Sequence, residues 1–237
     1  MRISSKWIVA AGCVGLATAL SSIALAQEHV EEAYIKRPVR APKDAFELGV
    51  SAAYSQALAS PAPGFGTTDL TKAGGAFGIQ VGYRFVPEFG LHLFGTYNEF
   101  APGNALSGDA ATRGGTAGIS GTFHILPYQR VDPWVRVGTG YRMLWVTGTG
   151  AVDATWHGFE YAKLDIGADL RTSEDVSIGP TVGVGLTEFI WRNPTGDVGD
   201  VEITNKRVAP YIYAGMEAKF DIGGLRQRNI ASMTSSR

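Results

Sequence analysis

PWVRVGTGYRMLWV, residues 133–146, places two arginines and two glycines at even positions. Its odd positions, from Val135 to Trp145, are apolar or aromatic apart from Thr139. A period of two is typical of a β-strand, whose successive side chains point to opposite faces of the sheet. Arg136 and Arg142 therefore share one face with the two glycines, and the apolar face must meet a different environment.

The same alternation recurs along the chain, and it predicts eight strands. We expect them at 45–56, 74–85, 89–100, 115–126, 134–146, 158–170, 176–190 and 207–221. Short connections (86–88, 127–133, 172–176) alternate with longer ones rich in Gly, Pro, Thr, Ser and Asp (57–73, 101–114, 147–157, 191–206). This pattern predicts an all-β fold, an eight-stranded antiparallel up-and-down barrel with short turns at one end and long loops at the other.

The composition of the two faces indicates which one points outward. One face carries small residues and a few charges, and the other is aliphatic with aromatic residues near the strand ends. A soluble barrel would keep the apolar face inside, whereas a transmembrane barrel turns it toward lipid. An arginine facing lipid at the bilayer midplane would cost about 2–4 kcal/mol. We therefore predict a transmembrane β-barrel, with a soluble barrel as the less favoured alternative.

The aromatic residues of the apolar face form two groups, as the girdles of membrane barrels do. The short-turn group contains Phe46, Phe85, Phe89, Phe123 and Phe220, and the long-loop group contains Tyr54, Phe77, Tyr97, Trp145 and Trp191.

The N-terminal residues 1–26 are typical of a secretory signal peptide. Arg2 and Lys6 precede an apolar stretch, and ALA at 24–26 is a small-residue cleavage site. An uncleaved anchor is the alternative, and Cys13 in AAGC leaves lipidation open. We expect 27–43 to be a charged periplasmic arm, 44–222 the barrel, and 223–237 a short periplasmic tail.

Nine charged residues are expected on the inward face. They are Glu47, Arg84, Arg136, Arg142, Lys163, Asp165, Asp169, Glu217 and Lys219. Buried charges are stable only when paired, and eight strands leave an interior just wide enough for side chains. We predict a structural network of salt bridges that plugs a polar lumen, with a narrow ion path lined by the same residues as the alternative.

Enzyme, cofactor and metal sites find little support in the sequence. His92 and His124 are expected inside the barrel near the short turns, and His157 begins the sixth strand without a serine in register to serve as a nucleophile. The GxG pairs precede no helix, and Asp197 and Asp200 are too few to indicate a calcium site. We predict no catalytic, cofactor or metal site. A net charge of −1 without a basic block gives no support for a nucleic-acid partner.

The last strand ends in YAGMEAKF, 213–220, in which Tyr213, Gly215, Ala218 and Phe220 look like the signal read by the barrel-assembly machinery. With the strand pattern, this makes residues 44–222 resemble the small eight-stranded outer-membrane β-barrel proteins of the OmpA/OmpX transmembrane-barrel type. The resemblance implies a bacterial outer membrane, outer-membrane lipid and the barrel-assembly machinery as partners, periplasmic termini and four extracellular loops. The arm and the tail are departures, and the tail is too short for a peptidoglycan-binding domain.

The function that follows is a non-enzymatic structural or surface-interaction role through the loops, with an unidentified surface or periplasmic partner. A small ion or solute pore and a lipid-modifying enzyme are the two alternatives.

Overall fold

The computed structural model describes residues 40–60, 64, 66, 68–106, 109–148, 153–194 and 199–226. The expected signal peptide with Cys13, residues 27–39 of the arm and the tail beyond 226 lie outside this range. Within it, no helix is long and apolar enough to cross a membrane.

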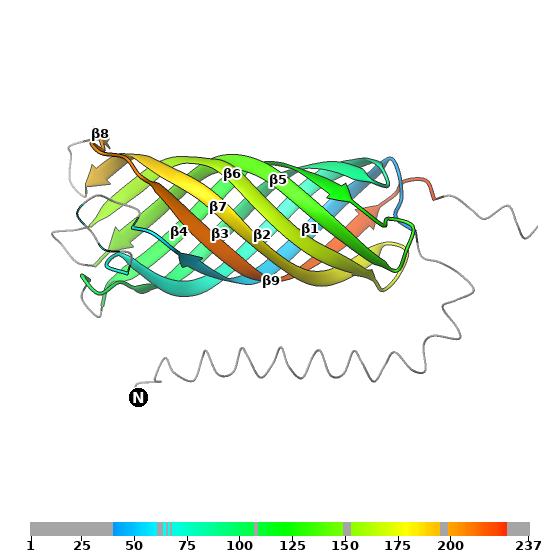
Figure 1. Cartoon of the computed structure of the whole chain (residues 1–237), viewed down its shortest axis with the longest axis horizontal. Coiled ribbons are helices and arrows are strands. Elements are labelled where there is room, and N and C mark those ends of the chain that lie inside the picture. The colour runs from blue at the N-terminus through cyan, green and yellow to red at the C-terminus, as the bar shows by residue number, and fades with distance from the viewer. Residues whose placement is uncertain are drawn as a thin grey trace, which may run out of the picture. The chain divides into compact units, whose positions relative to one another are not determined.

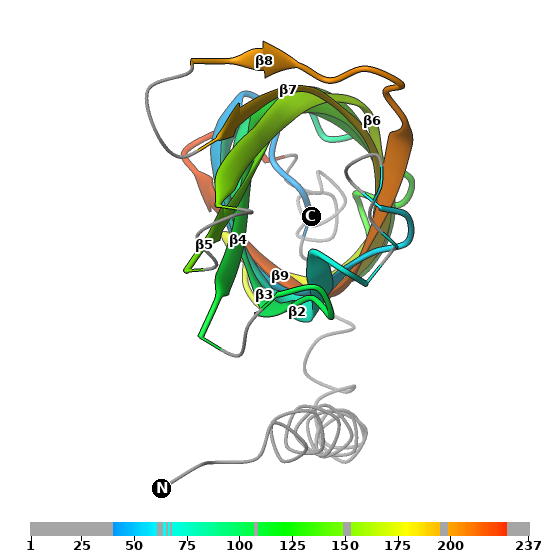
Figure 2. The same ribbon diagram turned by 90° about the vertical axis from the view of Figure 1, so that its left-hand side faces the viewer.

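The described part of the chain forms eight long strands and one strand of two residues (Figure 1). The long strands are β1 (Ala45–Ala57), β2 (Thr71–Val86), β3 (Phe89–Pro102), β4 (Ala111–His124), β5 (Val131–Thr147), β6 (Ala154–Arg171), β7 (Val176–Pro194) and β9 (Val208–Ile222), and the short one is β8 (Val201–Glu202). Each long strand pairs antiparallel with the next, and β9 pairs with both β7 and β1. The sheet is therefore a closed ring, with β8 beside β7 (Figure 2). The predicted eight-stranded up-and-down barrel is confirmed.

The two ends of the barrel differ in their connections. The turns at 87–88, 125–130 and 172–175 lie at one end, together with the first and last described residues (Figure 1). There Lys43 pairs with Leu225, and the backbone N–H of Ala41 donates to the carbonyl of Pro127 at 2.8 Å. The chain just before β1 is thereby tied to the C-terminal segment and to the β4–β5 turn. The longer connections and β8 lie at the other end.

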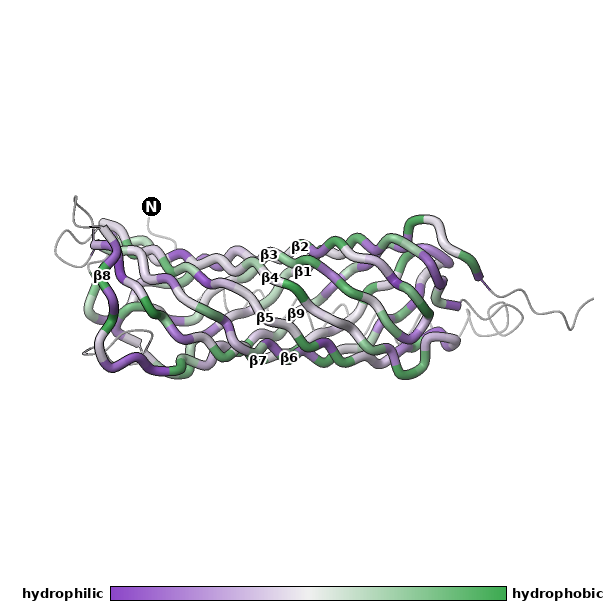
Figure 3. Tube along the Cα trace, turned by 90° about the horizontal axis from the view of Figure 1, so that it is seen from above, coloured by the Kyte–Doolittle hydropathy of each residue, from purple (hydrophilic) through white to green (hydrophobic). Residues whose placement is uncertain are grey.

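The middle of the barrel carries its apolar side chains on the outside. Ile79 and Leu93, for example, are 64% and 66% exposed. The aromatic residues expected at the short-turn end are all exposed, as are Tyr54, Phe77 and Tyr97 at the long-loop end. Purple and green alternate along the strands in Figure 3, which reflects these two faces. Such a belt is stable where the surroundings are apolar, since exposed apolar area is unfavourable in water by about 25 cal/mol per Å².

Four strands extend further toward the long loops than the sequence pattern predicts. β2 begins at Thr71, β4 at Ala111 and β6 at Ala154, and β7 continues to Pro194. The alternation of polarity reverses in this region. Leu144 of β5 is buried inside, whereas the pair formed by Arg113 and Glu99 is half exposed on neighbouring strands. A prediction based on apolar residues facing outward therefore places the strand ends too far from the long loops.

A β-bulge interrupts β6. On β5, Gly140 faces Glu160 and Gly138 faces Lys163, so β6 contains one residue more than its partner between these two pairs. An extra residue changes the face on which the following side chains lie. Glu160 and Lys163 therefore both point inward, and unbroken alternation over 158–170 does not hold.

Candidate functional site: the charged barrel interior

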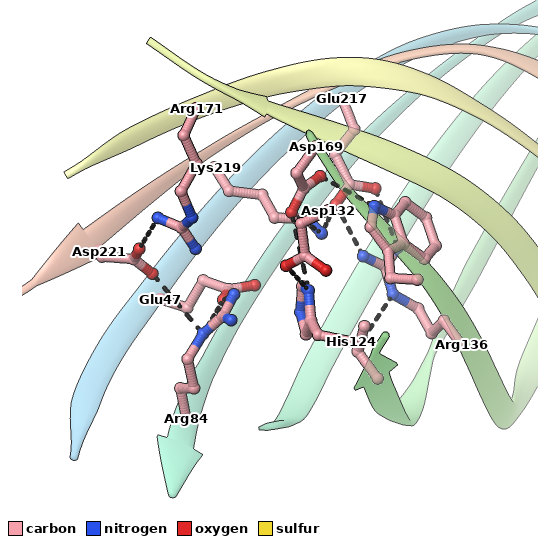
Figure 4. Close-up of polar contacts among 12 residues, drawn as sticks. Glu47, Arg84, His124, Asp132, Arg136, Asp169, Arg171, Glu217, Lys219 and Asp221 are labelled. Carbon is pink, nitrogen blue, oxygen red and sulfur yellow. Dashed lines mark hydrogen bonds and ion pairs between the residues drawn. The ribbon is translucent and has the colours of Figure 1, made fainter. Parts of the chain in front are cut away.

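All nine charged residues expected in the lumen lie inside the barrel. They come from five strands: Glu47 (β1), Arg84 (β2), Arg136 and Arg142 (β5), Lys163, Asp165 and Asp169 (β6), and Glu217 and Lys219 (β9). All except Lys163 are almost completely buried, and the Lys163 side chain is 13% exposed. Figure 4 shows the part of this network around Glu47, Arg84, Arg136, Asp169, Glu217 and Lys219, with the further residues that they contact.

Nearest the short turns, Arg84 and His92 share the carboxylate of Glu47. The Arg84 guanidinium donates to Glu47 Oε2 at 2.6 Å and to the carbonyl of Pro87 at 3.0 Å. His92 Nε2 lies 3.0 Å from Glu47 Oε1. Gly82 makes room for this imidazole, because a Cβ at that position would lie 2.2 Å from His92 Cδ2.

A second group lies at the same end on β4, β5, β6 and β9. Asp169 accepts hydrogen bonds from Lys219 at 2.9 Å and from the indole of Trp134 at 2.8 Å. Beside it, His124 Nδ1 lies 2.7 Å from Asp132, whose other oxygen accepts the backbone N–H of Leu126 at 3.1 Å. This carboxylate holds the turn before β5 against the histidine.

Asp132, Arg171 and Asp221 belong to this network, although the sequence prediction did not include them. Arg171 donates to Asp221 at 2.8 Å. Continuing the inward alternation by one step at the ends of the sixth and eighth predicted segments would have found Arg171 and Asp221. Asp132 was assigned to a turn, whereas β5 begins at Val131.

In the middle of the barrel, Arg136 and Glu217 form a two-pronged pair. The two terminal guanidinium nitrogens donate to the two carboxylate oxygens at 2.7 and 2.9 Å. Gln80 donates to the same carboxylate at 2.9 Å, and Thr122 accepts from Arg136 Nε at 3.1 Å. Hydrogen bonds between two charged groups are about twice as strong as neutral ones, and the fork geometry fixes both partners.

Beside this pair lies a cavity of about 60 Å³. Lys163 and Asp165, which form an ion pair, contribute to its lining, together with Gly49, Gly78 and Thr96. The cavity has room for very few water molecules. The charged network continues on the side of the cavity nearer the long loops.

Toward the long loops, Arg142 is the last charged group of the network. It interacts with Glu160 at 3.3 Å and with the hydroxyl of Tyr213, and it lies 4.1 Å from the centre of the Tyr211 ring. Glu160 is the partner that the bulge in β6 turns inward. The sequence contains one signal of the bulge. Glu160 stands at an even position, whereas the other inward charges of β6, beginning with Lys163, stand at odd positions.

Beyond Arg142 apolar side chains predominate in the interior, beside the buried Asn98 and Thr112, and we call the apolar group the cap. Its buried residues are Ala57, Leu70, Phe100, Leu144, Val146, Ala154, Trp156, Phe189, Ala209, Tyr211 and Tyr213. Leu106 and Ile203, from two of the long connections, pack against it. The sequence predicted a polar lumen, whereas the structure has a mainly apolar filling near the long loops. The strands continue beyond the outer aromatic residues, and there the barrel is filled in the way a soluble protein is.

The charges inside the described barrel nearly cancel. Seven carboxylates (Glu47, Asp132, Glu160, Asp165, Asp169, Glu217, Asp221) meet six basic side chains (Arg84, Arg136, Arg142, Lys163, Arg171, Lys219). Ligand atoms of His124, Asp132 and Asp169 lie within 4.8 Å of one another, a spacing that would suit a metal ion. Lys219 already provides a cation at Asp169. The arrangement is that of a mutually neutralised polar core.

The remaining residues singled out in the sequence lie apart from this network or at its edge. His157 points outward near the long loops, 3.2 Å from Asp200. In the last strand Tyr213 points inward, Ala218 and Phe220 lie on the outward face, and Gly215 packs against β1, where a Cβ would lie 2.2 Å from the carbonyl oxygen of Ala52. Their role as an assembly signal stays a prediction.

Solved structures share this closed ring. Neisserial surface protein A aligns with a TM-score of 0.54 and 12% identity over 74% of this chain and 96% of its own. OprG, an outer membrane protein from Pseudomonas aeruginosa, aligns with a TM-score of 0.50 and 13% identity over 76% of this chain and 98% of its own. The fold is that of the small outer-membrane barrels. No protein-family model and no curated protein matches the sequence.

Proposed function

We propose that this chain is a bacterial outer-membrane β-barrel protein, closed to solutes and without enzymatic activity. The observation that carries the proposal is the inverted polarity of the barrel. Ile79 and Leu93 are largely exposed outside, whereas Arg136 and Glu217 are buried within. In water the exposed apolar face would be unfavourable, whereas in a bilayer it is favourable and the paired charges stay out of the lipid.

The closed lumen is supported by two different fillings in series. The charged network extends from the short turns past the middle of the barrel to Arg142, and the cap lies beyond it toward the long loops. Because the side chains of the interior contact one another, we propose that other molecules bind to the outer surface and the long loops. By the resemblance stated above, the short turns and both termini face the periplasm, and the four long connections face outward.

Membrane insertion is tested by refolding the protein into detergent or lipid vesicles. We expect β-type circular dichroism and a migration on gels that changes on heating, as for a barrel that resists detergent until it is boiled. A protein that remains monomeric in buffer without detergent would contradict the proposal. Protease treatment of intact cells tests the orientation, because cleavage should occur in the long connections and spare the short turns.

The assembly signal is tested separately in cells. Phe220→Ala should reduce the amount of barrel in the outer membrane, because under this proposal the exposed aromatic residue of the last strand is what the assembly machinery binds. Phe123→Ala is the matched control, since it also removes an exposed outward phenylalanine near the short turns. Equal loss for the two variants would assign Phe220 a general role in the girdle.

A further inference from the structure

One sector of the outer surface near the long loops differs from the rest of that rim. On β5, β6 and β7, five rings form a continuous cluster, which we call the ring cluster: Tyr141, His157, Phe159, Tyr161 and Trp191. The imidazole of His157 stacks on Trp191 with centroids 5.6 Å apart and planes at 24°. Phe159 and Tyr161 are 43% and 53% exposed, so the cluster offers open ring surface to a ligand.

A row of polar groups lies along one edge of the ring cluster. Asp200, in the connection between β7 and β8, accepts from Asn193 at 3.2 Å and lies 3.2 Å from His157 Nε2. The other ring nitrogen of His157 meets the hydroxyl of Tyr141. The side chain of Asp200 is 51% exposed and that of His157 only 13%. The histidine thus fixes the position of a carboxylate that remains accessible from outside.

The opposite sector of the same rim is built differently. There the hydroxyl of Tyr97 donates to Glu99 at 2.6 Å, and that of Tyr54 donates to Gln56, in each case two residues along the same strand. Among the ring contacts of the described residues, none involves Tyr54 or Tyr97. In an ordinary aromatic girdle, a tyrosine needs only a hydrogen-bond partner for its hydroxyl, and a neighbour on the same strand can provide it. Linked rings also occur in the short-turn girdle, from Phe46 through Tyr83 and Phe85 to Phe89. The ring cluster adds to them the carboxylate of Asp200, fixed at its edge by His157 and Asn193.

Open aromatic faces beside a fixed carboxylate and amide match the chemistry of a sugar. The C–H face of a pyranose packs on an aromatic ring, and its hydroxyls donate to a carboxylate and accept from an amide. Sites for small ligands in general combine apolar and aromatic walls with a few well-placed polar groups.

The position of the ring cluster identifies the kind of molecule that would carry the sugar. Below it on the same strand, Leu164 and Ile166 belong to the exposed apolar belt, and above it the outward residues become polar. A ligand that meets both surfaces has acyl chains and a sugar headgroup. We infer that the ring cluster and Asp200 bind the sugar headgroup of a glycolipid in the outer leaflet. The inference rests on the proposed insertion in the membrane.

The test is native mass spectrometry of the detergent-solubilised full-length barrel, titrated with a glycolipid that carries a neutral hexose headgroup on a diacylglycerol. We expect the wild-type protein to retain this glycolipid at least tenfold more strongly than phosphatidylglycerol. Asp200→Ala and Trp191→Leu should weaken retention five- to tenfold, because one removes the fixed carboxylate and the other the stacked ring. Arg113→Ala, on β4 and outside the ring cluster, is the matched control and should leave retention unchanged.

Three outcomes would overturn the inference. Equal retention of the glycolipid and phosphatidylglycerol would make the ring cluster a plain girdle. Equal loss in Asp200→Ala and Arg113→Ala would remove the assignment of the site. Binding of the free hexose as tight as that of the glycolipid would identify a soluble glycan instead. Heat-modifiable migration, recorded for each variant, reports barrel insertion independently, so a failure of the proposed function is distinguishable from a failure of this site.

Discussion

At the scale of single residues, the pair of Arg136 and Glu217 shows what a buried charge requires. Each partner is largely buried, and each is held by the other through two hydrogen bonds. Arg136→Met would leave Glu217 buried without its main partner, and breaking a buried pair in this way typically costs 3–5 kcal/mol, so we expect a loss of about that size. Urea unfolding of the barrel in lipid vesicles measures it.

Two further variants separate the pair from its surroundings. The double variant Arg136→Met, Glu217→Gln should recover part of the loss, because no unpaired charge remains. Arg113→Ala, which breaks the exposed pair with Glu99, should change the free energy of unfolding little, since exposed ion pairs contribute little. Equal destabilisation by Arg136→Met and Arg113→Ala would contradict the assignment of the interior network.

At the scale of elements, the bulge in β6 decides which charges face the lumen. Deleting Ala162, an exposed residue next to the bulge, would restore strict alternation and shift one part of the strand by one position. Either Glu160 or the set beginning with Lys163 would then face lipid, at about 2–4 kcal/mol for a lysine or arginine near the midplane. We expect the deletion variant to give little heat-modifiable barrel on refolding.

Ala162→Val is the matched control for that deletion. It keeps the number of residues in β6 and adds apolar volume on the lipid side, so it should refold like the wild-type protein. Normal refolding of the deletion variant would mean that the bulge does not set the register.

The strands also show how far sequence reasoning reaches. Period-two alternation predicted the strand number, the order and the outward face, because the belt imposes one polarity on every strand. It did not identify Glu160 as an inward residue, because a bulge changes the face without changing the composition. It did not find the cap, because Leu144 and Trp156 lie on the face that carries charges elsewhere. A search for strands with apolar residues outward finds only the region in which the apolar residues do face outward.

At the scale of the whole molecule, the two fillings of the lumen act in series. The cap alone should block ions because its apolar side chains cannot replace an ion's water shell. The charged network alone should block them because its side chains fill the lumen. Wild-type barrels should therefore show no discrete conductance steps in planar bilayers. Leu144→Ala with Trp156→Ala should remain closed, and so should Arg136→Ala with Glu217→Ala.

Only the combination of all four substitutions should open a continuous path and produce conductance steps. Each large-to-small change in the cap removes about 2–5 kcal/mol of stability, so every variant must first show heat-modifiable migration before it is measured. Steps in the cap variant alone would mean that the charged network is permeable, and the polar half would then be an ion path after all. Steps in the wild-type protein would replace the closed barrel by a small pore lined by Arg136, Lys163 and Glu217.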